Sequence, residues 1–314
     1  MQRLSLTIRL VSQFSTPLKG DTLFGQLCWI LRERLGDSGL TDLLDGYTTQ
    51  RPFAVISDAI PKEAIPKPCL PLHCFGFDKQ VTTTRKRFKK SLWLRSQLLD
   101  TPVPHWGSSL IDDLNSAPFS AYQVEHSAQP HNSINRMTMT TGEGDFAPYS
   151  VQRMQVPAHA QWLLHILFDP ARIDSTLLID AVTQMGLEGF GKDASIGKGR
   201  FVVESSNICT PDTPSSTSWL TLAPADLRHD NALADKTFYQ TLTRFGKHGR
   251  TAVLSGKPFK NPILLADSGA VVTLPDNEPK LFIGNGLGGN GELSQHISAT
   301  VHQGYSPVLP ISLG

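Results

Sequence analysis

The first ten residues alternate between polar and apolar side chains, which predicts a strand with one buried face. Its apolar positions are Leu4, Leu6, Ile8 and Leu10. Residues 22–35 (TLFGQLCWILRERL) instead repeat apolar side chains at helical spacing, and Asp21 stands where an N-cap is expected. Residues 51–58 (RPFAVISD) predict a second strand, so the chain opens with strand, helix and strand.

The same succession recurs from about residue 160. Residues 161–169 (QWLLHILFD) predict a strand, 173–188 (IDSTLLIDAVTQMGLE) a helix, and 201–206 (FVVESS) a further strand. Two such units predict an α+β protein with two related domains, each an antiparallel sheet backed by helices. We place these domains at 1–155 and 156–314.

The segments between and after these units carry two basic runs. Residues 79–99 contain seven basic and no acidic residues, with apolar residues at helical spacing, which predicts a basic helix or arm. Residues 101–150 are rich in Pro, Ser, Thr, Gly and Asn and are expected to form loops or a hairpin. Residues 234–245 (ADKTFYQTLTRF) predict a short helix, within a stretch from 236 to 266 that has six basic and no acidic residues.

Composition excludes several classes of protein. The 314 residues carry a formal net charge of +1, so any contact with a polyanion must use local basic clusters. The N-terminus lacks the apolar core of a signal peptide, and no apolar run approaches the roughly 20 residues of a membrane helix. Cys69, His73 and Cys74 resemble half of a zinc site without a second half. We therefore expect a cytoplasmic protein that has no contact with membranes and no metal.

Residues 189–201 (GFGKDASIGKGRF) resemble a phosphate-binding loop but do not fit the known nucleotide motifs. Gly191 to Gly197 is one residue too long for a P-loop, and Gly199 stands where Ser or Thr is required. The dinucleotide pattern fails because this stretch leaves a helix and enters a strand, the reverse of what that motif needs. A second match at 284–289 has too little chain after it, so no cofactor is expected. The stretch suits a phosphodiester backbone, or it is a tight turn with solvated basic residues.

Catalytic motifs are sparse. There is no G-x-S-x-G elbow and no G-G-D-D signature. Four histidines have the chemistry for metal-free RNA cleavage as general acid or base. These are His131, His165, His248 and His302. A histidine without a visible partner is more often structural, and His165 lies within an apolar strand.

Three stretches together resemble a known family. They are 16–31 (TPLKGDTLFGQLCWIL), 131–138 (HNSINRMT), and the pairing of 189–201 with the closing segment GLGGNGELS…VHQGYSPVLPI. In this order they resemble the RAMP superfamily of CRISPR proteins, and within it the type III-A (Csm complex) subunits that cap the 5′ end of the CRISPR RNA. The resemblance covers essentially the whole chain.

The resemblance implies an architecture and a role. The architecture is two ferredoxin-like (RRM-like) domains with glycine-rich loops and a thumb or arm inserted at about 79–150. The role is that of a non-catalytic RNA-binding subunit in antiviral defence. Its partners in a hetero-oligomer would be the 5′ repeat-derived tag of the CRISPR RNA, the large polymerase-like subunit and a RAMP backbone subunit.

The resemblance and the basic runs together select the residues expected to bind RNA. Those expected to contact phosphates, or to follow the RNA as an arm, are Lys19, Arg85, Lys86, Arg87, Lys89, Lys90, Lys192, Ser195, Lys198, Arg200 and Arg250. Those suited to bases are Asn132, Asn135, Arg136, His302, Gln303 and Tyr305, although Asn132 could equally stabilise a turn and Tyr305 could equally be core. The aromatic signature of an RRM sheet is missing, so we expect capture by loops rather than stacking on a sheet.

Two other functions remain open from the sequence. One is a RAMP endoribonuclease that processes precursor CRISPR RNA without a metal, using one of the histidines. The other is a small-molecule enzyme on an unrelated α+β scaffold.

Overall fold

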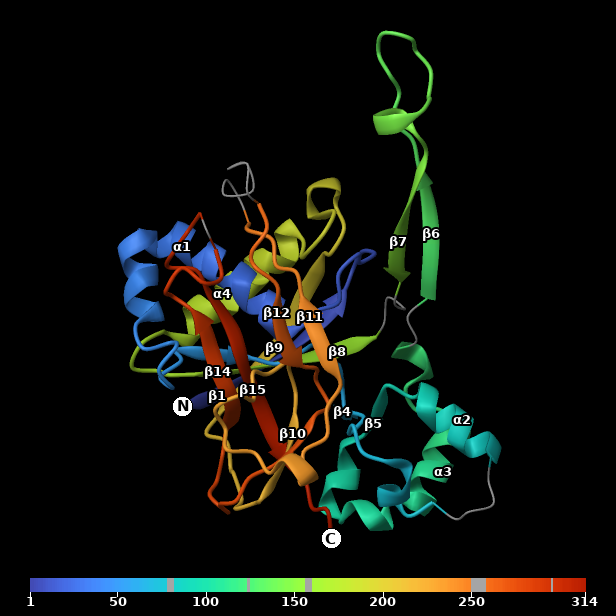
Figure 1. Ribbon diagram of the computed structural model, residues 1–314, viewed down its shortest axis with the longest axis vertical. Helices are drawn as coiled ribbons and strands as arrows, with labels where there is room; N and C mark the ends of the chain where they lie inside the picture. The colour runs from blue at the N-terminus through green and yellow to red at the C-terminus, as the bar shows by residue number, and fades with distance from the viewer. Residues whose placement is uncertain (78–81, 123–124, 156–159, 250–257, 295) are drawn as a thin grey trace.

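Two antiparallel sheets form the body of the molecule, and a helical insertion and a long hairpin extend from it (Figure 1). The computed structural model describes residues 1–77, 82–122, 125–155, 160–249, 258–294 and 296–314. The strand order is β2-β8-β1-β9 in the first sheet, with β3 also beside β8, and β13-β10-β15-β14 in the second.

The first sheet is built around the opening strand, as its alternating pattern predicts. Its strands are β1 (Gln2–Leu10), β2 (Ala54–Ile56), β3 (Ile60–Pro61), β8 (Gln161–Phe168) and β9 (Phe201–Cys209). Helices α1 (Gly20–Leu44) and α4 (Ser175–Glu188) carry the predicted apolar faces. The alternate residues from Leu4 to Leu10 are buried in one core with Leu27 and Leu178, and this part of the prediction is confirmed.

The predicted domain boundary is wrong, because the two strand–helix–strand units are halves of one sheet. Strand β1 pairs antiparallel with β8 on one side and with β9 on the other, with Leu6 opposite both Leu164 and Ser206. A boundary at 155/156 would cut these ladders. Each half shows its buried face in the sequence, but hydrophobic period does not reveal which strands become neighbours.

The second sheet lies C-terminal to the first. Its strands are β10 (Ser218–Thr221), β13 (Val271–Thr273), β14 (Phe282–Gly288) and β15 (Val301–Pro310). A two-stranded ribbon, β11 (Thr241–Arg244) with β12 (Ile263–Ala266), lies beside it. The helix predicted at 234–245 is wrong: apart from the short 3-10 turn η7 (Ala234–Lys236), the described chain there is extended. Residues 241–244 alternate between exposed and half-buried positions, the period of a strand.

The insertion between β3 and β8 has a helical part and a hairpin. The helical part contains β4 (Ala64–Pro66), η1 (Leu72–Phe75), α2 (Thr82–Lys90), β5 (Trp93–Arg95), η2 (Ser96–Asp100), η3 (Val103–His105), α3 (Gly107–Ser116) and η4 (Ser120–Tyr122). Phe75, Phe88 and Trp106 form its core together with Leu220 and Ile311 of the C-terminal region. The predicted basic helix is real but ends at Lys90.

The hairpin pairs β6 (Glu125–His131) with β7 (Tyr149–Gln155) and points away from the body (Figure 1). Its far end holds the short turn η5 (Gly144–Phe146). The prediction of loops or a hairpin over 101–150 is confirmed for the hairpin, whereas α3 was not predicted.

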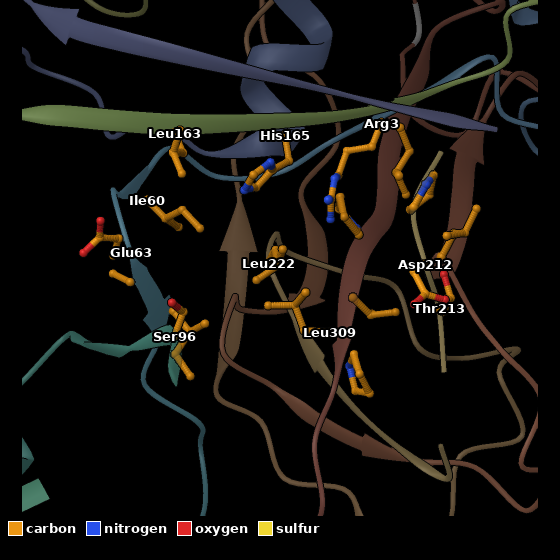
Figure 2. A pocket seen from close by; sticks show the side chains of 18 residues that line it. Arg3, Ile60, Glu63, Ser96, Leu163, His165, Asp212, Thr213, Leu222 and Leu309 are labelled. Atoms are coloured by element: carbon orange, nitrogen blue, oxygen red, sulfur yellow. The ribbon is translucent and has the colours of Figure 1, made fainter. Parts of the chain in front are cut away.

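A cavity of about 230 Å³ separates the two sheets (Figure 2). Arg3 and His165 of the first sheet line it, opposite Leu309 of the second sheet and Leu222, which follows β10. The Nδ1 atom of His165 lies 3.0 Å from the hydroxyl oxygen of Ser5. Burial, helped by the charge of Arg3, lowers the pKa of His165 from 6.5 to about 4. His165 is therefore a half-buried, neutral residue of the cavity at physiological pH.

This histidine should make stability depend on pH. Between pH 6.5 and about 4 the unfolded chain binds a proton that the folded chain refuses, so acidification favours unfolding. The loss from this group should reach at most about 3 kcal/mol and be complete below the folded pKa. Urea unfolding across this range, compared between the wild type and His165→Gln, isolates the effect from other titrating groups. If the stability of both proteins fell with pH to the same extent, His165 would not be the group responsible.

Candidate nucleic-acid interface

A groove of about 530 Å³ combines aromatic and basic side chains. We call it the Trp groove; its apolar wall is formed by Phe14, Leu92, Trp93 and Trp162, and its basic residues are Lys19, Lys67 and Lys89. Trp93 meets Trp162 edge to face, with ring centroids 6.1 Å apart. Aromatic surfaces beside lysines are the combination that binds single-stranded nucleic acid.

Two of the segments predicted to contact RNA, the basic helix and the glycine-rich loop, reach this groove, whereas the predicted base contacts at 132–136 lie at the far end of the hairpin. Lys89 belongs to the basic helix α2. At the base of the hairpin, Gln155 accepts a hydrogen bond from Gln13 at 3.3 Å. The glycine-rich loop 189–200 attaches on the same side, where the Lys192 amide donates to the groove residue Thr16 at 2.9 Å. The groove is therefore a junction that no single sequence motif reveals.

Lys19 lies in the groove but does not offer a free charge. Its Nζ lies 2.9 Å from Asp58 and 2.7 Å from Asp267, and it also donates to Ser268. Burial works against the charge, but the two carboxylates outweigh it and raise the pKa of Lys19. Lys19 therefore does not make the predicted phosphate contact. Its two ion pairs instead join loops of the two sheets.

Asp21 is not the helix cap that the sequence predicts. The N-cap position is Lys19, and Asp21 follows in the first turn of α1 with its side chain buried. Its carboxylate accepts two hydrogen bonds from Arg244, at 2.6 and 3.0 Å, and lies 3.2 Å from Nε2 of His302. Burial opposes ionisation, but His302 and Arg244 together lower the pKa of Asp21. This buried cluster joins α1 to β11 and β15.

The three base contacts predicted on β15 are corrected by this packing. His302 is 6% exposed and faces Asp21. The amide of Gln303 is fully buried and makes hydrogen bonds to both the N–H and the C=O of Ile56, at 2.9 and 2.7 Å. Tyr305 is also fully buried, and its hydroxyl donates to the Tyr47 carbonyl at 2.6 Å. Side chains without exposed surface cannot stack on a base, and these hold the second sheet against the first.

The glycine-rich loop uses its glycines to pack against its own chain. Gly199 has a φ of 74°, and a Cβ there would lie 2.1 Å from the Phe190 carbonyl oxygen. Gly191 likewise lies against Thr16. These glycines therefore form a tight turn from α4 into β9, which was one of the two interpretations of this stretch. They are not used to bring the backbone close to a ligand.

The basic residues of this loop divide into two kinds. Lys192, Ser195 and Arg200 are exposed, as a phosphate contact requires. Lys198 is instead 6% exposed and forms an ion pair with Asp193 at 3.1 Å, so its predicted phosphate role is corrected.

Charge removal separates these two kinds of lysine. Lys192→Gln combined with Arg200→Gln should weaken RNA binding and reduce the salt slope of log K by about one per lost phosphate contact. Lys198→Gln should leave that slope unchanged and lower stability, because it leaves Asp193 unpaired. Fluorescence anisotropy at several salt concentrations and thermal unfolding measure both. If the salt slope of RNA binding fell in Lys198→Gln but not in the double variant, Lys198 would be the phosphate contact instead of Lys192 and Arg200.

The basic helix presents an exposed charged face. Lys86, Arg87, Lys89 and Lys90 are exposed and Arg85 is half-buried, so the predicted arm is available to a polyanion. Arg87 also donates to the Leu114 carbonyl of α3, which fixes the helix on the insertion. At its C-terminus, Lys67 donates to the carbonyls of Phe88 and Lys89 at 3.0 and 2.9 Å.

The far end of the hairpin holds the remaining predicted base contacts. Asn132 and Arg136 are exposed there. Asn135 accepts a hydrogen bond from the Met137 amide at 2.9 Å, so its side chain stabilises the turn. The sequence reasoning missed the apolar character of this end, where Met137 is 93% exposed. Arg250 lies outside the described residues.

Most of the histidines considered for catalysis are enclosed. His165 pairs with Ser5, His302 with Asp21, and His248 is buried with Nε2 2.8 Å from the Ser294 hydroxyl. His131 stacks on Tyr149 in the hairpin. Within the described ranges, no group of three or more His, Cys, Asp or Glu side chains is arranged to hold a metal ion. The described helices include none that is both long enough and apolar enough to cross a bilayer.

Comparison with known proteins relates this fold to solved structures. The chain is similar to a chain of a Csm1–Csm4 cassette in complex with pppApA, with 16% identity, a TM-score of 0.59, and coverage of 100% of this chain and 99% of that one. The cassette in complex with cA4 gives the same values. A Csm3–Csm4 subcomplex of the type III-A CRISPR-Cas interference complex matches with 15% identity, a TM-score of 0.61, and coverage of 99% and 100%.

These matches establish a shared fold over the full length of the chain. No protein-family model matches the sequence, and no curated protein does either. The similarity that the motifs indicated is confirmed at the level of the fold, by chains of Csm subcomplexes.

Proposed function

We propose that this chain is the subunit of a type III-A CRISPR interference complex that holds the 5′ repeat-derived tag of the CRISPR RNA. It would contact the large polymerase-like subunit on one side and the first backbone subunit on the other. The observation that carries the proposal is the full-length match to chains of two different subcomplexes. Csm4 is the component that both subcomplexes have in common.

The topology supports this assignment. Read along the chain, the first sheet is β1-α1-β2-β8-α4-β9, and its spatial order β9-β1-β8-β2 is that of a ferredoxin-like unit. The insertion and hairpin enter between β2 and β8, as a thumb would. The second sheet would be a diverged counterpart of this ferredoxin-like unit. It departs from that unit in that none of its described connections is an α-helix.

The surface chemistry supports RNA as the ligand. In the Trp groove, the exposed Leu92 and the half-buried Trp93 supply apolar surface for unstacked bases, and Lys89 supplies charge beside them. Lys86 and Lys90 are exposed on the same helix. The exposed Lys192 and Arg200 extend that charge to the glycine-rich loop. A net charge of only +1 makes this clustering the source of affinity for a polyanion.

We further propose that the chain binds RNA without cleaving it. A general acid must reach the scissile phosphate, and His248 and His302 are buried and held by Ser294 and Asp21. His165 is half-buried in the cavity between the sheets, where it hydrogen-bonds to Ser5. The endoribonuclease alternative would therefore have to depend on His131 or on a histidine outside these four.

Reconstitution tests the proposed role. The full chain is co-expressed with the large subunit, the backbone subunit and a CRISPR RNA, and the purified complex is treated with nuclease. We expect a stoichiometric complex in which roughly 4–16 nucleotides at the 5′ end are protected, the footprint of a single binding module. A complex that assembles fully and protects the 5′ end without this chain would contradict the proposal.

A further inference from the structure

An exposed aromatic face lies on the two-stranded ribbon β11–β12, outside the Trp groove. Tyr239, Phe245, Phe259 and Leu264 are 50%, 72%, 67% and 63% exposed, and we call them the ribbon face. Solvent contact with four large apolar side chains on one short ribbon is unfavourable for a free protein, so such a patch marks a binding surface.

Strand geometry puts these side chains on one side of the ribbon. Residues 239, 241, 243 and 245 are all exposed, as alternate positions of a strand should be when they share a face. Leu264 is directly opposite Thr243, and Phe259 is opposite Lys247, so both belong to that same face. The ribbon's other side is occupied, because Arg244 binds Asp21 there.

The cation on the described ribbon face is Lys247, which is exposed. Residues 236–266 contain no acidic residue to oppose it, and Arg244 is paired with Asp21 on the other side. Nζ of Lys247 lies 5.8 Å from the ring centroid of Phe259, so a cation adjoins an exposed ring. Exposed aromatic rings with interspersed cations suit single-stranded nucleic acid, whose bases stack on rings while its phosphates meet the cations.

One end of the ribbon also borders the Trp groove. Gln240, which precedes β11, and Asp267, which follows β12, both line the groove and are joined by a backbone hydrogen bond of 2.8 Å. On the ribbon face itself, the exposed rings beside Lys247 and the lack of acidic residues between 236 and 266 favour RNA over a protein partner.

We propose that the ribbon face is a second RNA-binding surface, on which unstacked bases of a single strand stack against Phe245 and Phe259 while Lys247 neutralises phosphate. This inference rests on the proposed RNA-binding function and extends it to a stacking site. The absence of the RRM aromatic signature argues against stacking on the main sheet of an RRM, but the ribbon β11–β12 is a separate two-stranded sheet.

Leucine substitutions separate stacking from general apolar contact. The full-length chain is titrated with a fluorescent single-stranded RNA of about twelve nucleotides, within the range of such sites. Phe245→Leu combined with Phe259→Leu keeps apolar bulk and removes both rings, and should weaken binding about tenfold with an unchanged salt slope. Lys247→Gln should instead reduce that slope by about one. Leu187→Ala, at a position on α4 that is 65% exposed, is the control and should bind as the wild type does.

The outcomes distinguish this inference from the function on which it rests. If the wild type binds RNA and the double leucine variant, folded by its melting temperature, binds equally well, the stacking site is refuted while the proposed function stands. Loss of co-purification with the large or backbone subunit, with RNA affinity unchanged, would make the face a protein interface and also refute the inference. If the wild type itself binds no RNA, the proposed function fails, and the stacking site with it.

Discussion

Replacing Asp21 with alanine is expected to lower the free energy of unfolding by about 3–5 kcal/mol. The side chain is buried, and its loss leaves the guanidinium of Arg244 and the imidazole of His302 without the carboxylate that pairs with both. Removing one member of a buried ion pair costs more than the pair contributes, because a desolvated charge remains. Urea unfolding of the purified full chain measures the change.

The same helix offers a matched control. Asp37 forms an ion pair with Arg32 on the surface of α1, where its side chain is 76% exposed. Asp37→Ala should cost less than about 1 kcal/mol, because solvent screens that pair. Equal losses in the two variants would show that the Asp21 cluster does not hold the two sheets together.

Replacing Leu92 with glutamate is expected to weaken RNA binding about tenfold or more, because like charges are brought together at the binding surface. Leu92 is 68% exposed on the wall of the Trp groove, so a polar residue fits there without disturbing the core. The new carboxylate would repel phosphates and partly neutralise Lys67 and Lys89. Anisotropy titration with single-stranded RNA measures the loss, and the melting temperature verifies the fold.

Position 187 supplies the control for this substitution as well. Leu187 is 65% exposed on α4 and is not among the residues that line the groove. Leu187→Glu adds the same charge to the same protein, so it should change affinity only slightly. If both glutamate variants lose affinity equally, the effect is one of net charge and the groove is not where RNA binds.

The sequence predicted those elements whose hydrophobic period is long and regular. The alternation in β1 and the helical spacing in α1 and α4 each reflect one buried face, so their type could be inferred from the chain alone. The pairing of β1 with both β8 and β9 could not, because the ladder joins residues about 160 and 200 positions apart and leaves no local pattern. The two halves of one sheet were therefore assigned to two domains.

The candidate site was predictable only where a residue's role does not depend on distant partners. Lys192 and Arg200 are exposed basic residues, as their polar surroundings suggest. Lys19 and His302 instead pair with carboxylates from distant parts of the chain, Asp267 and Asp21, and so take part in interactions within the protein. The Trp groove assembles residues from Leu10 to Ser268, and no spacing rule connects them.

The most direct test of the central claim is incubation of the purified full chain with repeat-derived RNA in the presence of a metal chelator. Binding and RNA integrity are followed in the same samples. The account predicts that the RNA is bound, with affinity that falls as salt rises, and remains uncut. Site-specific cleavage that a single His→Ala change, at His131 for example, abolishes would contradict it.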